Sequence, residues 1–217
     1  HKIGCLSIFC LFVVLIVMFM CRDNKKEMFS EKGKIAFVLS GRSYCYDDPL
    51  SPKYLIQETN GETYVSLNHP IGTDFIERFN VVKVDHKPFD VETELDVSTN
   101  NALREIIKES EYDGGWDGWV NTLSMHFHHM NNLNNIPEDK YDIVFCIRSD
   151  IQMEKQEYDN IINRLSHSKM KDNTIYTCNA ENNGVCDQYA YGNYKSMSKY
   201  LSLFSQIPKY TSLFSDM

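Results

Sequence analysis

The feature that most constrains the fold is an almost unbroken apolar run over residues 141–147, which ends in Arg148, Ser149 and Asp150. The run is too short for a globular helix, and its β-branched and aromatic residues favour a strand. Such a run is typical of a strand buried on both faces, in a parallel or mixed sheet with helices on both sides.

The charged residues that follow this run are expected at the carboxyl end of the strand. Ligands of open α/β sheets bind at that end. A charged pair held at the lip of a buried strand is costly without a partner, so Arg148 and Asp150 need a phosphate, a metal or each other. The sequence leaves two interpretations open: a ligand site, or a structural Arg–Asp pair that closes the strand.

The rest of the chain alternates between strand and helix patterns. Residues 34–39 form a second apolar run, and further strands are expected over residues 63–67, 79–85 and 173–177. Helical spacing marks residues 100–110, 120–134, 158–165 and 197–204, whereas residues 49–70 are turn-rich and residues 113–119 are a glycine-rich turn. This alternation predicts an α/β sandwich with a mostly parallel sheet.

Length and charge narrow the class of protein. The 217 residues suit one domain plus an anchor. The net charge is −8 and the basic residues are scattered, which argues against a nucleic-acid partner because a phosphate backbone requires a basic patch.

The first segment predicts a membrane anchor. Residues 3–21 carry no charge, and a helix needs roughly 20 apolar residues to cross a bilayer. The run ends in a poor cleavage site, so we expect an uncleaved transmembrane helix over residues 1–22 rather than a signal peptide. A charged stem over residues 23–33 and a domain over residues 34–217 follow.

The cysteines give conditional information about the compartment. Cys146 is expected to be a buried small hydrophobe. Cys178 and Cys186 are close enough in sequence to form a disulfide if the domain faces an oxidising lumen. The sequence has no Cys-x-x-Cys pair, which argues against a zinc site of that type.

Two loops carry groups suited to a nucleotide sugar. Ser40, Gly41 and Arg42 follow the strand at residues 34–39, where backbone N–H groups and an arginine can hold a phosphate, although an ordinary turn is favoured. Asp187 and Gln188 lie in a polar, glycine-flanked stretch with Tyr189 and Tyr191 nearby. A carboxylate, a carboxamide and aromatic rings suit a sugar, and a plain surface loop is the alternative.

His126 and His129 share one face of the helix expected over residues 120–134. That spacing can chelate a metal ion. We expect surface or partly packed histidines instead, because the His-Glu-x-x-His pattern is absent.

Residues 34–42, 141–150 and 184–192, taken together, resemble putative glycosyltransferases of the WavE lipopolysaccharide-synthesis family and related proteins of large DNA viruses. The family pattern is a first strand ending in Ser-Gly, a later strand ending in an Arg- and Asp-containing motif, and an Asp-Gln-aromatic-Ala-aromatic-Gly segment before a helix. The resemblance covers residues 34–204. It implies a Rossmann-like GT-A-type sandwich that uses a nucleotide-sugar donor.

By this resemblance the site residues take distinct roles. Asp187 and Gln188 would be catalytic, with Asp187 as the base, and Asp150 would bind a divalent cation, Mn²⁺ or Mg²⁺. The residues near the nucleotide and its diphosphate would be Ser40, Gly41, Arg42, Arg148 and Asp150.

The sequence also departs from the family pattern. Cys146 and Ile147 stand where the family often carries another arginine, and the Asp-x-Asp motif of many GT-A enzymes is reduced to Arg148-Ser149-Asp150. The last motif lies close to Met217, so a C-terminally shortened or inactive homologue is also considered.

The sequence therefore predicts a membrane-anchored glycosyltransferase that acts on a glycan or protein acceptor and faces the ER or Golgi lumen or belongs to a virion. Charges beside the anchor lean weakly towards a cytosolic domain, but we favour the lumen. The alternative is a non-catalytic, membrane-anchored surface or virion component with a degenerate glycosyltransferase fold.

Overall fold

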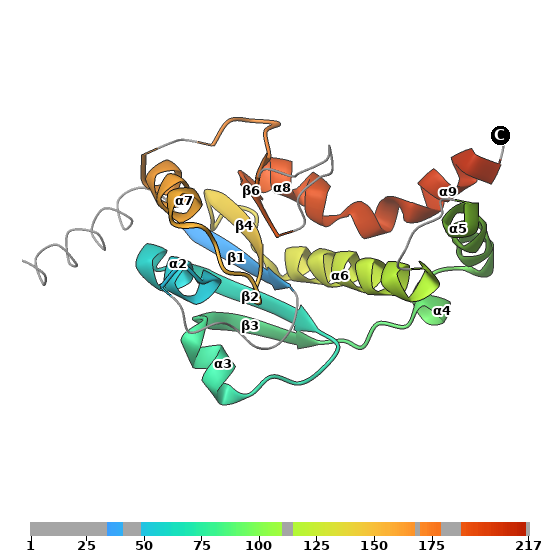
Figure 1. Ribbon diagram of the computed structural model, residues 1–217, viewed down its shortest axis with the longest axis horizontal. Coiled ribbons are helices and arrows are strands. Elements are labelled where there is room, and N and C mark those ends of the chain that lie inside the picture. Colours follow the sequence, from blue (N-terminus) through green and yellow to red (C-terminus); the bar gives the residue numbers. More distant parts are fainter. Residues whose placement is uncertain (1–33, 41–48, 110–114, 168–169, 179–187, 216–217) are drawn as a thin grey trace, which may run out of the picture.

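The computed structural model describes residues 34–40, 49–109, 115–167, 170–178 and 188–215 (Figure 1). The strands are β1 (Ile35–Ser40), β2 (Glu62–Leu67), β3 (Val81–His86), β4 (Ile143–Arg148), β5 (Tyr176–Thr177) and β6 (Tyr189–Gly192). The helices are α2 (Pro52–Thr59), α3 (Thr73–Arg78), α4 (Val91–Glu94), α5 (Val97–Glu109), α6 (Gly115–Asn135), α7 (Lys155–His167), α8 (Tyr194–Leu201), the 3-10 helix η2 (Leu203–Gln206) and α9 (Ile207–Ser215).

The described strands form one mixed, mostly parallel sheet in the order β3-β2-β1-β4-β6-β5. β1 pairs in parallel with both β2 and β4, and β2 pairs in parallel with β3, whereas β6 is antiparallel to β4 and to β5. The chain moves outwards from β1 to β3 and then returns to β4 on the other side of β1. The topological switch point, where such sheets bind ligands, therefore lies between β1 and β4.

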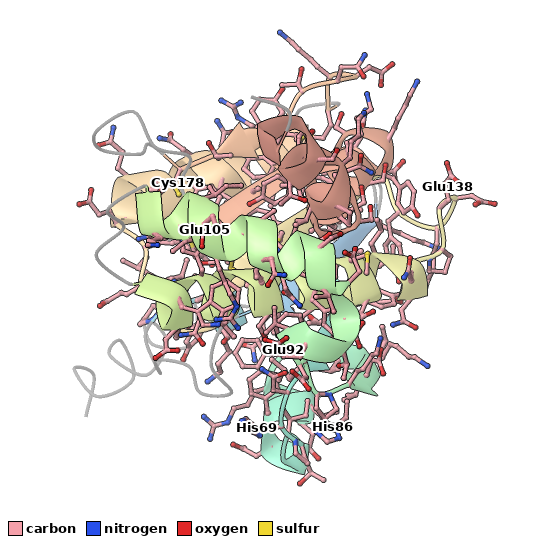
Figure 2. All side chains as sticks on the ribbon, turned by 90° about the vertical axis from the view of Figure 1, so that its right-hand side faces the viewer. His69, His86, Glu92, Glu105, Glu138 and Cys178 are labelled. Carbon is pink, nitrogen blue, oxygen red and sulfur yellow. The ribbon has the colours of Figure 1, made fainter. Side chains whose placement is uncertain are left out.

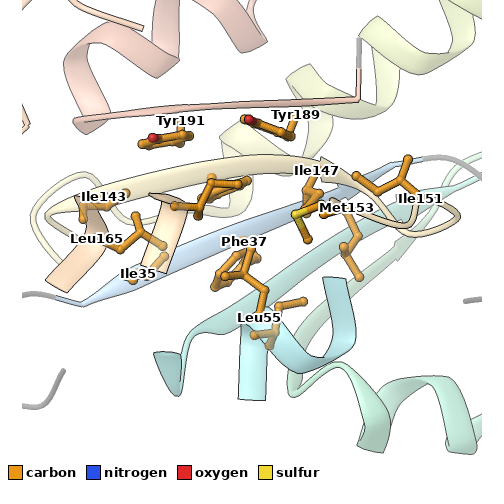
Figure 3. Packing of buried hydrophobic residues seen from close by; sticks show 14 of the residues in the cluster. Ile35, Phe37, Leu55, Ile143, Ile147, Ile151, Met153, Leu165, Tyr189 and Tyr191 are labelled. Atoms are coloured by element: carbon orange, nitrogen blue, oxygen red, sulfur yellow. The ribbon is translucent and has the colours of Figure 1, made fainter. Parts of the chain in front are cut away.

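One face of the sheet packs against α2, α3 and α7 (Figures 1 and 3). A row of stacked rings crosses this face, because Phe37, Phe145, Tyr191 and Tyr176 occupy paired positions on four neighbouring strands. Their ring centroids are 5.4, 4.8 and 5.2 Å apart in that order. The guanidinium of Arg164 lies 4.5 Å from the ring centroid of Tyr176 at the end of the row.

The opposite face packs against α6 and α8. Its strand residues are smaller and include Ala36, Val38, Val144, Cys146 and Ala190, all buried. Small side chains allow the two helices to approach the sheet closely.

A second group of helices extends the molecule past the sheet. Figure 1 shows α4, α5 and α9 beyond the carboxyl ends of β2 and β3, with α6 running from this group back over the sheet. Their own apolar cluster includes Leu103, Phe127 and Phe204. We call α4, α5, α9, η2 and the first half of α6 the helical extension. Figure 2 looks onto it from its outer side.

The expected fold class is confirmed at the level of an α/β sandwich with a mostly parallel sheet. Two expectations about elements were wrong. Residues 52–59 form a helix rather than turn-rich chain, and residues 115–119 begin α6 rather than forming a turn. The short helix over residues 73–78 was not anticipated.

The expected anchor and stem over residues 1–33 lie outside the described residues. Within the part of the chain that the structure describes, no helix combines the length and apolar character needed to span a membrane.

Candidate functional site

Ser40 and Arg148 lie directly opposite each other, at the carboxyl ends of the parallel strands β1 and β4. The next residue, Ser149, fastens these two ends together, because its backbone N–H and its hydroxyl both donate to the carbonyl oxygen of Ser40, at 2.9 and 3.2 Å. Ser40 and Ser149 are both buried. The switch point of the sheet is thus a tightly closed junction with Arg148 at its rim.

Gln188 joins the same edge from the other side. The backbone N–H of Arg148 donates to the carbonyl oxygen of Gln188 at 2.9 Å, one position beyond the antiparallel pair Ile147–Tyr189. The side chain of Gln188 is exposed. Three of the residues expected in the site, Ser40, Arg148 and Gln188, are therefore neighbours in one row across the end of the sheet.

The row faces the side covered by α6 and α8. Side chains alternate along a strand, so Ser40 shares a face with Val38, and Arg148 shares that face with Cys146. Ser66 of β2 continues the row, because it follows Val65, the partner of Leu39. Its hydroxyl contacts a histidine of α6, which places it on the same face. The row thus lies on the side of the sheet from which α6 runs into the helical extension (Figure 1).

Arg148 and Asp150 form an ion pair with two hydrogen bonds. Nε of Arg148 donates to Oδ1 of Asp150, and Nη2 donates to Oδ2, both at 3.1 Å. The side chain of Asp150 is only 7% exposed, whereas that of Arg148 is 34% exposed. The side chain of Asp150 is therefore nearly enclosed, and that of Arg148 is the more exposed of the two.

This pairing does not fit the expected role of Asp150 as a metal ligand. Both carboxylate oxygens accept hydrogen bonds from a cation, and a divalent ion needs several oxygen ligands in a position that it can reach. Among the described residues, no group of three or more His, Cys, Asp and Glu side chains is arranged to hold a metal ion.

Gly41, Arg42 and Asp187 lie outside the described residues, so their expected roles at the nucleotide and as the base stay predictions from the sequence.

The two tyrosines expected beside the sugar are instead core residues. Tyr189 and Tyr191 are 6% and 4% exposed and belong to β6 rather than to a loop. The ring of Tyr191 stacks between Phe145 and Tyr176, and the hydroxyl of Tyr189 donates to Oε1 of Glu157 at 2.7 Å. Burial raises the pKa of Tyr191 to about 12. These rings stabilise the sheet and do not offer a face to a sugar.

A polar network that the sequence analysis missed lies at the end of β2. Nδ1 of His128 is 2.8 Å from the hydroxyl of Ser66, and its Nε2 is 3.0 Å from Oδ1 of Asn68. Asn68 also accepts from the backbone N–H of Phe89 at 2.8 Å and donates to the hydroxyl of Ser124 at 3.1 Å. Because Oδ1 of Asn68 can only accept, the neutral imidazole carries its proton on Nε2 and accepts from Ser66 on Nδ1.

This network fastens the carboxyl end of β2 to α6 and to the chain that leads into the helical extension. The signal in the sequence was the same one that identified Ser40 and Arg148: Ser66 and Asn68 are polar residues at the end of an apolar strand pattern. Burial lowers the pKa of His128 to about 4, so the imidazole is neutral at pH 7.

His126 and His129 do not form a metal site with other described residues. His129 is 2% exposed, which corrects the expectation of surface or partly packed histidines, and its Nε2 lies 3.2 Å from Sγ of Cys146. Burial lowers the pKa of His129 to about 3 and raises the pKa of the Cys146 thiol above its ordinary range. Both groups are therefore neutral at pH 7.

The cysteine expectations are met in part. Cys146 is a buried free thiol in β4, as expected. Cys178 is disulfide-bonded, and the expected partner, Cys186, lies outside the described residues.

Comparison with known proteins adds no relative: no family model, no curated protein and no solved structure matches the chain.

Proposed function

We propose that this chain is a membrane-anchored glycosyltransferase that moves a sugar from a nucleotide-sugar donor to a glycan or protein acceptor. The observation that carries the proposal is the row formed by Ser40, Arg148 and Gln188 at the switch point between β1 and β4. This is the place where open α/β sheets bind ligands, and it is where the sequence resemblance puts the donor.

The chemistry at this edge concerns a departing diphosphate. In the transfer, the bond between the sugar C1 and the diphosphate oxygen breaks, and a bond between C1 and the acceptor oxygen forms. Negative charge develops on the nucleoside diphosphate, and stabilising that charge is the main catalytic task. Arg148 is proposed as the cation that does so, since its side chain is partly exposed and its backbone is held by two neighbouring strands.

The remaining roles rest on the sequence. Asp187 is proposed as the base that takes the proton of the acceptor hydroxyl, and Gln188 as a contact to the sugar or acceptor. Ser40, Gly41 and Arg42 are proposed to lie beside the nucleotide. The GT-A form of the fold belongs to the same proposal.

The disulfide of Cys178 supports a domain that faces an oxidising compartment, because disulfides persist in the secretory lumen and on surfaces rather than in the cytosol. We propose that the N-terminal residues anchor the chain with the domain on the lumenal side, in the ER or Golgi or in a virion.

Binding of nucleotides to the purified full chain tests this function. A nucleotide present at 100 times its dissociation constant adds about 2.7 kcal/mol to the free energy of unfolding, which raises Tm by roughly 5–10 °C for a domain of this size. We expect such a shift from at least one member of a panel of nucleoside diphosphates and nucleotide sugars. The shift should disappear in Arg148→Gln.

Arg78→Gln is the matched control. Arg78 also forms an ion pair with an aspartate, at 2.8 Å between its Nε and Oδ1 of Asp74, but on α3, which precedes the amino end of β3. This variant should keep the full nucleotide shift. A panel without any shift would contradict the proposal.

One observation favours a second candidate, a non-catalytic anchored domain with a degenerate glycosyltransferase fold. Arg148 and Asp150 satisfy each other with two hydrogen bonds, as a purely structural pair would. This candidate predicts that no nucleotide stabilises the chain. It also predicts that Arg148→Gln changes the stability of the chain and has no effect on ligand binding.

A further inference from the structure

The two side chains of the Arg148–Asp150 ion pair are unequally exposed to solvent. The side chain of Asp150 is 7% exposed and that of Arg148 is 34% exposed, so Arg148 is the partner that solvent reaches more readily. An anion that approaches the edge of the sheet from solvent therefore meets the cation of the pair first. The carboxylate behind it fixes the plane of the guanidinium, because Nε and Nη2 are each bonded to a different oxygen.

The backbone of Arg148 is fixed as well. The residue pairs with Ser40 on one side, its N–H donates to Gln188 on the other, and Ser149 adds two hydrogen bonds to Ser40. An arginine held in this manner loses little further conformational entropy when it binds a planar or tetrahedral oxyanion.

A metal ion on Asp150 would require a different arrangement. It would have to approach an enclosed carboxylate whose two oxygens both contact a guanidinium, and it would place a second positive charge beside Arg148. Repulsion between the two cations and the loss of both hydrogen bonds oppose that arrangement.

We propose that Asp150 is a positioning residue for Arg148, and that this guanidinium, rather than a metal ion held by Asp150, receives the diphosphate group of the substrate. The proposal rests on the function proposed above, and it goes further by assigning a metal-independent role to the carboxylate that the resemblance connects with a cation. Arg148 makes a further interaction besides these two hydrogen bonds, so incoming phosphate oxygens would add to a guanidinium that is already engaged.

A cycle of mutation and metal removal tests this assignment. The affinity of the full chain for inorganic pyrophosphate is measured by calorimetry in EDTA and again with the manganese–pyrophosphate complex. The proteins compared are the wild type, Asp150→Asn, Arg148→Gln and the control Arg78→Gln. Free Mn²⁺ is titrated in parallel into the wild type and Asp150→Asn, and its binding is followed by the electron paramagnetic resonance signal of the metal.

We expect the wild type and Arg78→Gln to bind pyrophosphate in EDTA. Arg148→Gln should bind it roughly tenfold or more weakly, as expected for the loss of charge-assisted hydrogen bonds. Asp150→Asn should change the affinity for pyrophosphate by the same factor with and without Mn²⁺, and the two factors should agree within about twofold. The reason is that the carboxylate of Asp150 acts only through the guanidinium of Arg148. The binding of free Mn²⁺ should be equal in the wild type and Asp150→Asn. If Arg148→Gln fails to fold, Arg148→Lys, which keeps the charge but lacks the planar fork, should show a smaller loss of the same kind.

Two results would overturn the assignment: no pyrophosphate binding in EDTA, or an effect of Asp150→Asn that exists only with Mn²⁺. The failure of the proposed function would look different. In that case pyrophosphate binds through Arg148 as described, but no nucleoside diphosphate or nucleotide sugar stabilises the chain.

Discussion

Ser40 of β1 and Arg148 of β4 face each other across the switch point of the sheet, and Ser149 ties the two strand ends together through the carbonyl of Ser40. Everything proposed for function depends on this relationship, because it sets one cation at the edge where such sheets bind ligands.

The ion pair at this edge should be energetically coupled. Arg148→Gln leaves Asp150 enclosed without its cation, and we expect it to lower the free energy of unfolding by roughly 1–3 kcal/mol, less than for a fully buried pair because Arg148 is partly exposed. The double variant with Asp150→Asn should recover part of that loss, since no charge is then left unpaired. Urea unfolding of the four proteins measures the coupling; strictly additive effects would show that the pair contributes nothing.

The ring of Tyr191 should matter for stability, and its hydroxyl should not. Tyr191→Ala removes the middle of the stacked row between Phe145 and Tyr176, and we expect a loss of about 3–5 kcal/mol. Tyr191→Phe keeps the ring and should stay within about 1 kcal/mol of the wild type. If Tyr191→Phe selectively weakens sugar binding at unchanged stability, the assignment of this residue to the core is wrong.

Acid should destabilise the protein through His128. Its pKa is near 6.5 in the unfolded chain and about 4 in the folded one, so below pH 6.5 the unfolded state binds a proton that the folded state does not. The contribution of neutral His128 to the free energy of unfolding is fully present above pH 6.5. It is lost as the pH falls towards 4, by about 1.4 kcal/mol per pH unit and roughly 3 kcal/mol in total.

The free energy of unfolding, measured by urea titration between pH 7.5 and 4.5, tests this dependence. In His128→Gln the slope of the free energy of unfolding against pH should decrease by the contribution of about one proton, about 1.4 kcal/mol per pH unit. An unchanged slope would mean that His128 titrates normally in the folded state.

Gly61 should not tolerate a side chain. A Cβ atom built there would lie 2.2 Å from Cε2 of Phe37, whose ring is fully buried in the stacked row. We expect Gly61→Ala to cost about 1–3 kcal/mol, as overpacking does in a well-packed core. Gly72→Ala is the matched control, because no atom lies within 4 Å of the position that a Cβ atom would take there, and it should cost less than about 1 kcal/mol. Equal thermal stability of the two variants would contradict this packing.

The strands at the centre of the sheet were predictable because β1 and β4 are continuous apolar runs that end in polar residues. That pattern also placed Ser40 and Arg148 at one edge. The helix α2 was missed although Ser51 and Pro52 mark its start in the usual way.

Other features depend on tertiary partners that a single sequence does not reveal. β6 has only four residues, two of them alanine and glycine, and it is a strand because β4 and β5 pair with it. His128 and His129 resemble surface residues of a polar helix, and they are buried because Ser66 and Cys146 provide partners on the sheet below. Asp150 was expected to bind a cation, and the hydrogen bonds that it accepts from Arg148 follow only from the geometry of the strand end.

Release of nucleoside diphosphate from a panel of nucleotide sugars tests the central claim most directly. The full chain is compared with Arg148→Gln and with the control Arg78→Gln, with and without candidate acceptors. The account predicts that one donor is turned over by the wild type and by Arg78→Gln, and that Arg148→Gln is slower by roughly a hundredfold, as for the loss of a donor that stabilises developing negative charge. Full turnover by Arg148→Gln, or no turnover of any donor by the wild type, would contradict it.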